Sequence, residues 1–204
     1  MSPPPVEITE RRVHLRGSPM AAIVLGMLGW RVLWNGLPAR QGVLVVYPHT
    51  SNWDFPVGLL AKWAFGIDCV FWGKDSLFKL PLIGRWMRWV GGVPVNRSAS
   101  GGMVGAMVAR MREAREQDRM LWLALAPEGT RSRAPGWRSG FYRVAVEAQV
   151  PVALVHLDFG RRVIGVHSCL MLGGDAEADM AEIARRFDGV QGYRPELAAP
   201  IRLT

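Results

Sequence analysis

The segment of this chain best suited to chemistry is Pro48–Asp54, in which a carboxylate follows a histidine by five positions. It comes directly after Gly42–Tyr47, a short apolar run rich in β-branched residues, which is typical of a strand buried on both faces. On the turn that leaves such a strand, the Asp54 carboxylate can hold one ring nitrogen of His49 and make the other more basic. The pair is therefore a candidate general base.

The same spacing has a purely structural interpretation. Ser51 precedes Asp54 by three positions, which fits a capping box at the start of a helix. In that case Asp54 would only satisfy the free backbone amides of the first helical turn. Spacing alone leaves both interpretations open.

Two further polar turns place arginines beside glycines. Pro127–Arg133 follows an apolar run, and Gly91–Ser98 contains Arg97. Glycine permits a tight backbone, and the planar guanidinium groups of Arg97 and Arg131 suit a phosphate or a carboxylate. The structural alternative is an ordinary surface turn held by a glutamate–arginine pair.

The scaffold for these turns is predicted from five short apolar runs and the longer stretches between them. Strands are expected at 42–47, 70–72, 121–126, 152–159 and 163–168, and helices at 57–66, 100–118, 139–149 and 176–187. Strands that alternate with helices predict an α/β fold, a single layered domain with a mostly parallel central sheet flanked by helices. Functional residues of such sheets gather at the carboxyl ends of the strands, where the polar turns stand.

The N-terminal segment, 1–38, is expected to precede the main domain at 39–204. Its apolar stretch Pro19–Trp30 is interrupted by Arg31 after about 12 residues, whereas a membrane span needs about 20. A helix that rests on a membrane or on the domain is expected instead. The residues expected near one face of this helix are Ile23, Met27, Trp30 and Trp34.

A second amphipathic stretch lies at 82–89. Its apolar residues at helical spacing are Leu82, Ile83, Trp86 and Trp89, and the basic residues around them are Lys74, Lys79, Arg85 and Arg88. A basic amphipathic helix is typical of a membrane surface. The alternative is an ordinary helix with its apolar face in the core.

Charge and composition favour a lipid partner. The chain has 25 Lys and Arg against 17 Asp and Glu, a net charge of +8, which suits nucleic acid, anionic lipid or a phosphorylated substrate. Nine Trp and ten Met beside three Tyr favour a lipid surface or pocket over nucleic acid. Cys69 and Cys169 form no CxxC or metal-ligand spacing, so we expect neither a disulfide framework nor a metal site.

The polar turns resemble the sequence blocks of one known family. His49–Asp54 resembles the HxxxxD motif of the glycerolipid (lysophosphatidate-type) acyltransferases. Gly92–Arg97 resembles the second block of that family, Glu128–Ser132 its EGTRS block and Val150–Val152 its fourth. The four blocks stand in the expected order.

By this resemblance, His49 is the general base that removes the proton of an acceptor hydroxyl, and Asp54 orients it. The hydroxyl would attack an acyl thioester directly, which needs no enzyme nucleophile, and the chain contains no GxSxG motif. The residues carried over as the acceptor-binding wall are Arg97, Glu128, Gly129, Thr130 and Arg131. Backbone amides at 128–130 are candidates for stabilising the oxyanion.

The resemblance implies an O-acyltransferase that moves a fatty acyl group from acyl-CoA or acyl carrier protein to a lysophospholipid such as lysophosphatidate. It implies no bound cofactor. The composition argues against a nucleic-acid partner. Members of this family often begin with a membrane-embedding helical pair, whereas the only candidate here, Pro19–Leu37, is short and broken by Arg31. We therefore expect the enzyme at the cytoplasmic face of a membrane, as a peripheral or monotopic protein. Two alternatives remain: a thioesterase or lipase acting on acyl thioesters or lipids, and a non-catalytic lipid-binding protein of the membrane surface.

Overall fold

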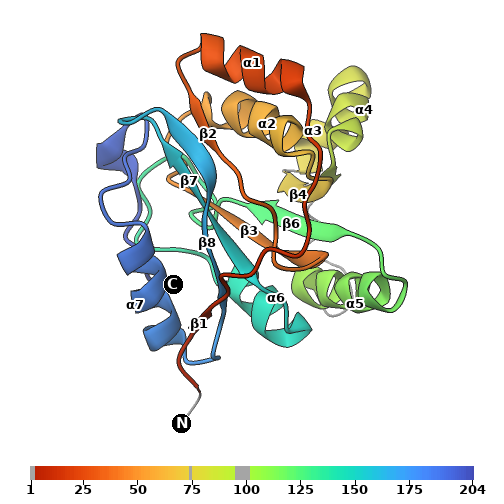
Figure 1. Cartoon of the computed structure of the whole chain (residues 1–204), viewed down its shortest axis with the longest axis vertical. Coiled ribbons are helices and arrows are strands. Elements are labelled where there is room, and N and C mark those ends of the chain that lie inside the picture. Colours follow the sequence, from red (N-terminus) through yellow and green to blue (C-terminus); the bar gives the residue numbers. More distant parts are fainter. Residues whose placement is uncertain (1–2, 74, 95–101) are drawn as a thin grey trace.

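A single mixed sheet forms the centre of the protein (Figure 1). The computed structural model describes residues 3–73, 75–94 and 102–204. Along the sheet the strands follow the order β1-β8-β7-β3-β6-β4-β5, and β2 also pairs with β8. The strands are β1 (Val6–Glu7), β2 (Arg31–Leu33), β3 (Gln41–Tyr47), β4 (Cys69–Gly73), β5 (Gly92–Pro94), β6 (Leu121–Leu125), β7 (Val152–Asp158) and β8 (Val163–Met171).

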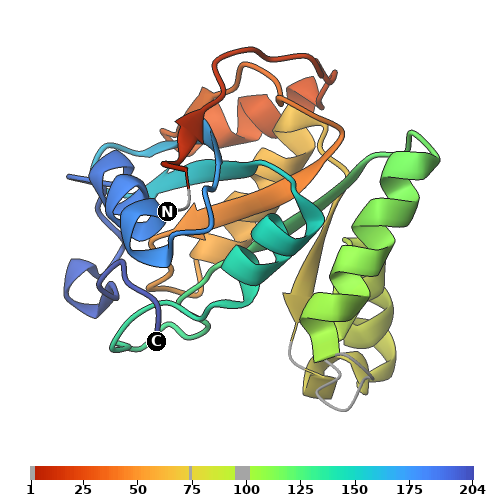
Figure 2. The ribbon, with the colours of Figure 1, turned by 90° about the horizontal axis from the view of Figure 1, so that it is seen from below.

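Helices pack on both faces of this sheet (Figure 2). They are α1 (Pro19–Met27), α2 (Asp54–Phe65), α3 (Asp75–Phe78), α4 (Pro81–Trp89), α5 (Gly102–Glu116), α6 (Gly140–Ala148) and α7 (Ala176–Arg186). The buried side chains of α1 and α2 share one core cluster, and those of α5, α6 and α7 share the other. The predicted α/β architecture is confirmed.

The sheet is mostly parallel, as expected, because helical crossovers connect most of its strands. The pair β7 and β8 is antiparallel. Only the short turn Phe159–Arg162 separates these two strands, and a turn of this length can join only antiparallel neighbours. The short strand β1 extends the antiparallel edge by pairing with β8.

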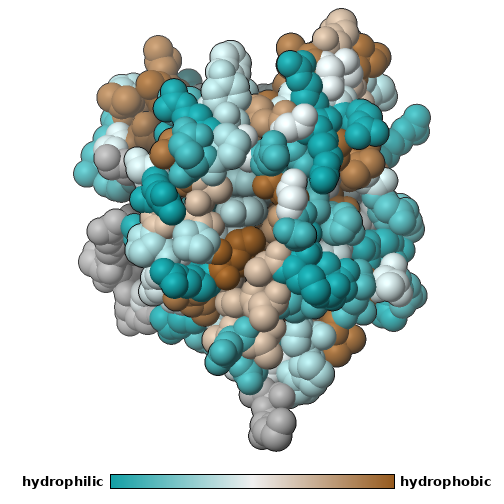
Figure 3. Space-filling view, turned by 90° about the vertical axis from the view of Figure 1, so that its left-hand side faces the viewer, coloured by the Kyte–Doolittle hydropathy of each residue, from teal (hydrophilic) through white to brown (hydrophobic). Residues whose placement is uncertain are grey.

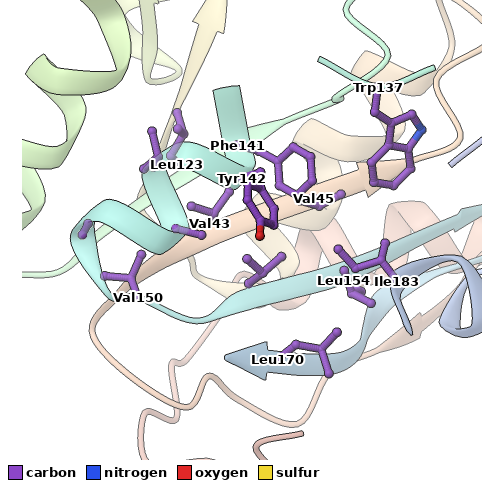
Figure 4. Packing of buried hydrophobic residues seen from close by; sticks show 14 of the residues in the cluster. Val43, Val45, Leu123, Trp137, Phe141, Tyr142, Val150, Leu154, Leu170 and Ile183 are labelled. Carbon is purple, nitrogen blue, oxygen red and sulfur yellow. The ribbon is translucent and has the colours of Figure 1, made fainter. Parts of the chain in front are cut away.

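The central strand β3 is buried on both faces, as its continuous apolar pattern predicted. Val43 and Val45 face α6, in the cluster that Figure 4 shows from close by. Leu44 belongs to the opposite cluster with α2. Because side chains alternate along a strand, this double burial fixes the register of β3 and therefore the position of the turn that follows it.

The N-terminal segment differs from the expected helix. Helix α1 ends at Met27, so the prediction that Trp30 and Trp34 continue its face is wrong. The backbone at Gly29 has a positive φ of 79°, which turns the chain away from the helix. Residues Arg31–Leu33 then pair in parallel with β8, and Trp30 is buried edge-on against Phe159.

Helix α4 presents its apolar residues to solvent, so the alternative in which they fill the core is wrong. Leu82 is 84% exposed and Trp89 is 72% exposed, while Ile83 and Trp86 are also exposed. The face of α4 that packs inward carries Met87 and Gly84 instead, the latter close to the backbone of α3. Within the described ranges, no helix is both long and apolar enough to cross a membrane.

Candidate active site

The turn after β3 brings His49 and Asp54 into contact. Asp54 is the first residue of α2, and its Oδ2 lies 3.0 Å from His49 Nδ1. The same oxygen accepts hydrogen bonds from the backbone N–H groups of Thr50 and Ser51 at 2.7 and 2.8 Å. Asp54 therefore pairs with the histidine and holds two amides of the turn before the helix. The N-cap of α2 is Trp53 and carries no side-chain cap, so the expected capping box of Ser51 and Asp54 does not form.

This pairing leaves Nε2 as the ring nitrogen of His49 available to a substrate. The His49 side chain is 21% exposed and lines the large cleft of the molecule, whereas the Asp54 side chain is only 2% exposed. Among the described residues, Asp54 Oδ1 is buried without a hydrogen-bond partner. The side-chain contacts of Asp54 in this part of the structure therefore all pass through Oδ2, which joins the His49 ring to the turn amides.

Glu128 lies beneath the cleft and does not line it. The residue is 2% exposed, and its Oε2 accepts a hydrogen bond from the backbone N–H of His49 at 2.5 Å. Its other oxygen, Oε1, accepts one from the backbone N–H of Ala199 at 2.9 Å. Burial raises the pKa of this carboxyl to about 6, although both backbone hydrogen bonds act in the opposite direction. The geometry suits a residue that positions the His49 turn.

The other residues of the EGTRS block do reach the cleft. Gly129, Thr130 and Arg131 all line it. Gly129 has a positive φ of 66°, a conformation that glycine adopts without strain, and its N–H closes a turn on the carbonyl of Ala126 at 3.1 Å. The backbone therefore bends sharply at the end of β6 and directs the next two residues into the cleft.

The remaining two blocks have different outcomes. In the second block, Gly92–Pro94 forms β5 and Pro94 lines the cleft, while Arg97 lies outside the described residues. In the fourth block, the carbonyl of Pro151 accepts a hydrogen bond from the N–H of Val43 at 2.9 Å. The fourth block thus supports the strand that carries His49 and does not contact the cleft.

The cleft has a volume of about 1640 Å³ and two unlike walls. One wall is apolar and comes from α2 and β4, with Phe55, Phe71 and Trp72. The other wall is basic and comes from the turn after β6 and the start of α6, with Arg131 and Arg138 among its residues. His49 lines the same cleft. This volume exceeds that of a typical small-ligand pocket.

Comparison with known proteins decides the family. A family model described as Acyltransferase matches residues 34–157, which include β3, the His49 turn and the EGTRS block. The chain belongs to the acyltransferase family. In fold, this acyltransferase resembles the crystal structure of the 1-acyl-sn-glycerophosphate (LPA) acyltransferase PlsC from Thermotoga maritima, with 20% identity and a TM-score of 0.51. The alignment covers 79% of this chain and 70% of that chain. No curated protein matches the chain.

The acyltransferase also uses its C-terminal segment to support the site, which sequence analysis missed. The backbone N–H of Arg194 donates to Thr50 Oγ1 at 3.1 Å, and Gly192 packs closely against the same threonine. The Tyr47 hydroxyl donates to the carbonyl of Ala199 at 3.1 Å. These contacts join residues about 150 positions apart through backbone groups, and no residue-type pattern could have indicated them.

The apolar wall and the second arginine of this acyltransferase were also missed. Phe55, Phe71 and Trp72 belong to elements whose apolar residues also fill the core, so their sequence pattern does not separate cleft from core. Arg138 stands just before the predicted helix 139–149, and only its position beside glycines and another arginine could have drawn attention to it.

Proposed function

We propose that this acyltransferase moves a fatty acyl group from an acyl thioester to the hydroxyl of a lysophospholipid, with His49 as general base and Asp54 as its partner. The observation that carries the proposal is the 3.0 Å contact between His49 Nδ1 and Asp54 Oδ2, two residues that line a cleft with both apolar and basic side chains. The contact fixes the tautomer of the ring and leaves Nε2 to accept a proton.

The reaction needs one proton acceptor and no covalent intermediate. His49 Nε2 takes the proton of the acceptor hydroxyl while the oxygen attacks the thioester carbonyl carbon. The tetrahedral intermediate then collapses, the carbon–sulfur bond breaks, and the departing thiolate takes the proton back from Nε2. The Asp54 carboxylate stabilises the imidazolium in between. A positioned base of this kind contributes about 10² to 10⁴ in rate.

The backbone at the EGTRS turn is our candidate for stabilising the oxyanion. The N–H of Gly129 is already bonded to Ala126, so it is a poor donor to a substrate. The N–H of Thr130 has no hydrogen-bond partner among the described residues, and Thr130 lines the cleft. We therefore assign the oxyanion donor to the Thr130 amide, because a fixed backbone N–H in a partly enclosed cleft stabilises developing charge.

The two walls suggest how the substrates lie. The apolar wall with Phe55, Phe71 and Trp72 suits the acyl chain, because burying methylene groups contributes about 0.8 kcal/mol each. Arg131 on the basic wall suits the anionic head group of the acceptor, since its planar guanidinium can bind a phosphate through two hydrogen bonds. An acceptor of the lysophosphatidate type has both features.

A membrane surface would supply such lipids, and α4 is our candidate docking element. Trp86 of α4 packs edge-on at 5.9 Å against Phe55 of the cleft wall, so the exposed face of α4 adjoins the cleft. Figure 3 shows apolar side chains at both upper corners of the molecule, the end at which α1 and α4 lie in Figure 1. Arg85 and Lys79 beside exposed tryptophans suit an anionic bilayer.

The decisive experiment is acyl transfer by the purified full chain. Palmitoyl-CoA and palmitoyl-acyl carrier protein serve as donors, and lysophosphatidate and neutral lyso-lipids serve as acceptors, with His49→Ala run beside the wild type. We expect the rate of acyl transfer to fall by a factor of at least about 10² in the variant, while its far-UV circular dichroism spectrum stays unchanged. Release of free fatty acid without transfer would favour a thioesterase, and equal transfer by His49→Ala would exclude the proposed base.

A further inference from the structure

The basic wall of the cleft contains more positive charge than the family motif explains. Residues 129–146 include four arginines and no aspartate or glutamate. Three of the four line the cleft, namely Arg131, Arg138 and Arg143. The fourth, Arg133, lies in the same exposed segment but does not line the cleft. The EGTRS block accounts for Arg131 alone.

Both the backbone and the side chain of Arg138 contact the EGTRS turn. Its backbone N–H donates to the carbonyl of Pro127 at 2.8 Å, which ties the start of α6 to the turn after β6. Its side chain lies across Gly129, where a Cβ atom would come within 2.5 Å of Arg138 Nε and 2.8 Å of Cδ. The missing side chain at Gly129 therefore makes the space in which the Arg138 guanidinium lies.

Arg138 has no acidic partner among the described residues, whereas Arg143 does. Arg143 Nε lies 3.3 Å from Glu147 Oε1, and this ion pair is on the exposed side of α6. No ion pair or side-chain hydrogen bond of Arg138 or Arg131 occurs in the described ranges. A guanidinium that is positioned by backbone contacts but left without a counter-charge in a substrate cleft is suited to an anionic ligand.

We propose that Arg138 is a phosphate-binding residue of this cleft, distinct from the motif arginines. The inference rests on the proposed function, because the substrates of that reaction offer the phosphate. Two sources share this chemistry: the head-group phosphate of a lysophosphatidate-type acceptor, and the phosphates of the CoA carrier. In either case two parallel N–H groups of the guanidinium donate to two phosphate oxygens.

Binding titrations on the full chain test whether Arg138 binds phosphate, and they do not depend on catalytic activity. CoA and glycerol 3-phosphate serve as separate probes in isothermal titration, with the wild type, Arg138→Gln and Arg133→Gln. Loss of one charge-assisted contact should weaken one probe about tenfold in Arg138→Gln. Arg133→Gln carries the same charge change outside the cleft and should stay within about twofold. The probe that weakens identifies the source of the phosphate.

Two results would overturn the proposal. One is wild-type affinity of Arg138→Gln for both probes, or no measurable binding of either probe by the wild type. The other is an equal loss in Arg133→Gln, which would show a general effect of net charge. Arg138→Lys adds a check on geometry, because it keeps the charge but not the paired N–H groups, and it should recover only part of the affinity.

The outcome is separable from that of the proposed function. Arg138-dependent binding of a probe by a protein that transfers no acyl group would support the subsite and overturn the transferase. Acyl transfer with unchanged KM for donor and acceptor in Arg138→Gln, together with unchanged titrations, would overturn the subsite and leave the transferase intact. Thermal midpoints within a few degrees of the wild type show that each variant is folded.

Discussion

The backbone N–H of His49 donates a hydrogen bond of 2.5 Å to the buried carboxylate of Glu128. The second carboxylate oxygen accepts a hydrogen bond from the backbone N–H of Ala199, so one side chain connects the His49 turn, the EGTRS turn and the C-terminal segment. Since Glu128 does not line the cleft, its effect on a substrate is transmitted through the position of His49. We therefore expect Glu128 to act by positioning His49.

Replacing Glu128 should therefore affect turnover more than substrate binding. In Glu128→Gln an amide NH₂ group meets one of two backbone N–H donors, so at least one charge-assisted hydrogen bond is lost. We expect kcat to fall by about 10- to 100-fold while KM changes less than about threefold. Steady-state kinetics with Glu147→Gln, an exposed glutamate on α6, provide the matched control. A rise in KM with unchanged kcat would instead support direct contact with the acceptor.

The raised pKa of Glu128 gives a second prediction, on stability. Burial raises this pKa from 4.5 to about 6, so between these values the folded state binds more protons than the unfolded state. The stabilisation from this group is complete below about pH 4.5 and is lost as the pH rises through about 6. Its size is about 2 kcal/mol at most.

The measurement is urea unfolding of the wild type and Glu128→Gln at pH 4.5 and pH 7. Because glutamine does not titrate, the free energy of unfolding of the variant relative to the wild type should rise by about 2 kcal/mol between the two pH values. A difference that stays constant with pH would mean that Glu128 titrates alike in the folded and unfolded states.

Asp54→Asn should lower activity strongly and leave the fold in place. Asparagine keeps an oxygen for the amides of Thr50 and Ser51, but it cannot balance the charge of a protonated His49. We expect kcat to fall by about 10² to 10⁴. Asp68→Asn, which changes a carboxylate that is almost fully exposed, is the control for charge. Near wild-type kcat in Asp54→Asn would mean that Asp54 only holds the amides of the turn.

The exposed face of α4 should dominate binding to anionic vesicles. Leu82→Ser with Trp89→Ser removes two of its most exposed apolar side chains, and each contributes about 1.5–3 kcal/mol when buried in lipid. We expect co-sedimentation with phosphatidylglycerol vesicles to weaken at least tenfold, and to weaken less for Met20→Ser on α1. Equal binding to neutral vesicles, or a larger loss from the α1 variant, would contradict this assignment.

Gly42 in β3 has no room for a side chain, so substitution there should destabilise the fold. A Cβ atom at Gly42 would overlap the ring of Trp122 and lie 2.8 Å from the carbonyl of Pro151. We expect Gly42→Ala to lower the free energy of unfolding by about 1–3 kcal/mol, measured by urea denaturation. Gly26→Ala is the matched control, because the space around Gly26 on α1 is open and alanine favours a helix. A neutral Gly42→Ala would show that β3 can shift.

Sequence patterns predicted secondary structure best where the spacing of apolar residues alone decides between strand and helix. The apolar run of β3 predicted a strand buried on both faces, and the helices expected at 139–149 and 176–187 match α6 and α7 within one residue at each end. The stretch after Pro19 was less well predicted because its apolar composition is compatible with both helix and strand. Pairing of Arg31–Leu33 with β8 settled that choice.

The sequence by itself determined the alternation of strands and helices and the order of the four motif blocks along the chain. Both depend on residue type and spacing, which are local properties. The tertiary structure alone decided that Glu128 lies under the cleft, that Arg138 lies across Gly129, and that the apolar side chains of α4 face solvent. The first joins residues 79 positions apart through a backbone N–H, the second depends on how two neighbouring turns pack, and the third depends on which face of a helix finds a partner. The order of residue types along the chain does not specify any of these relationships.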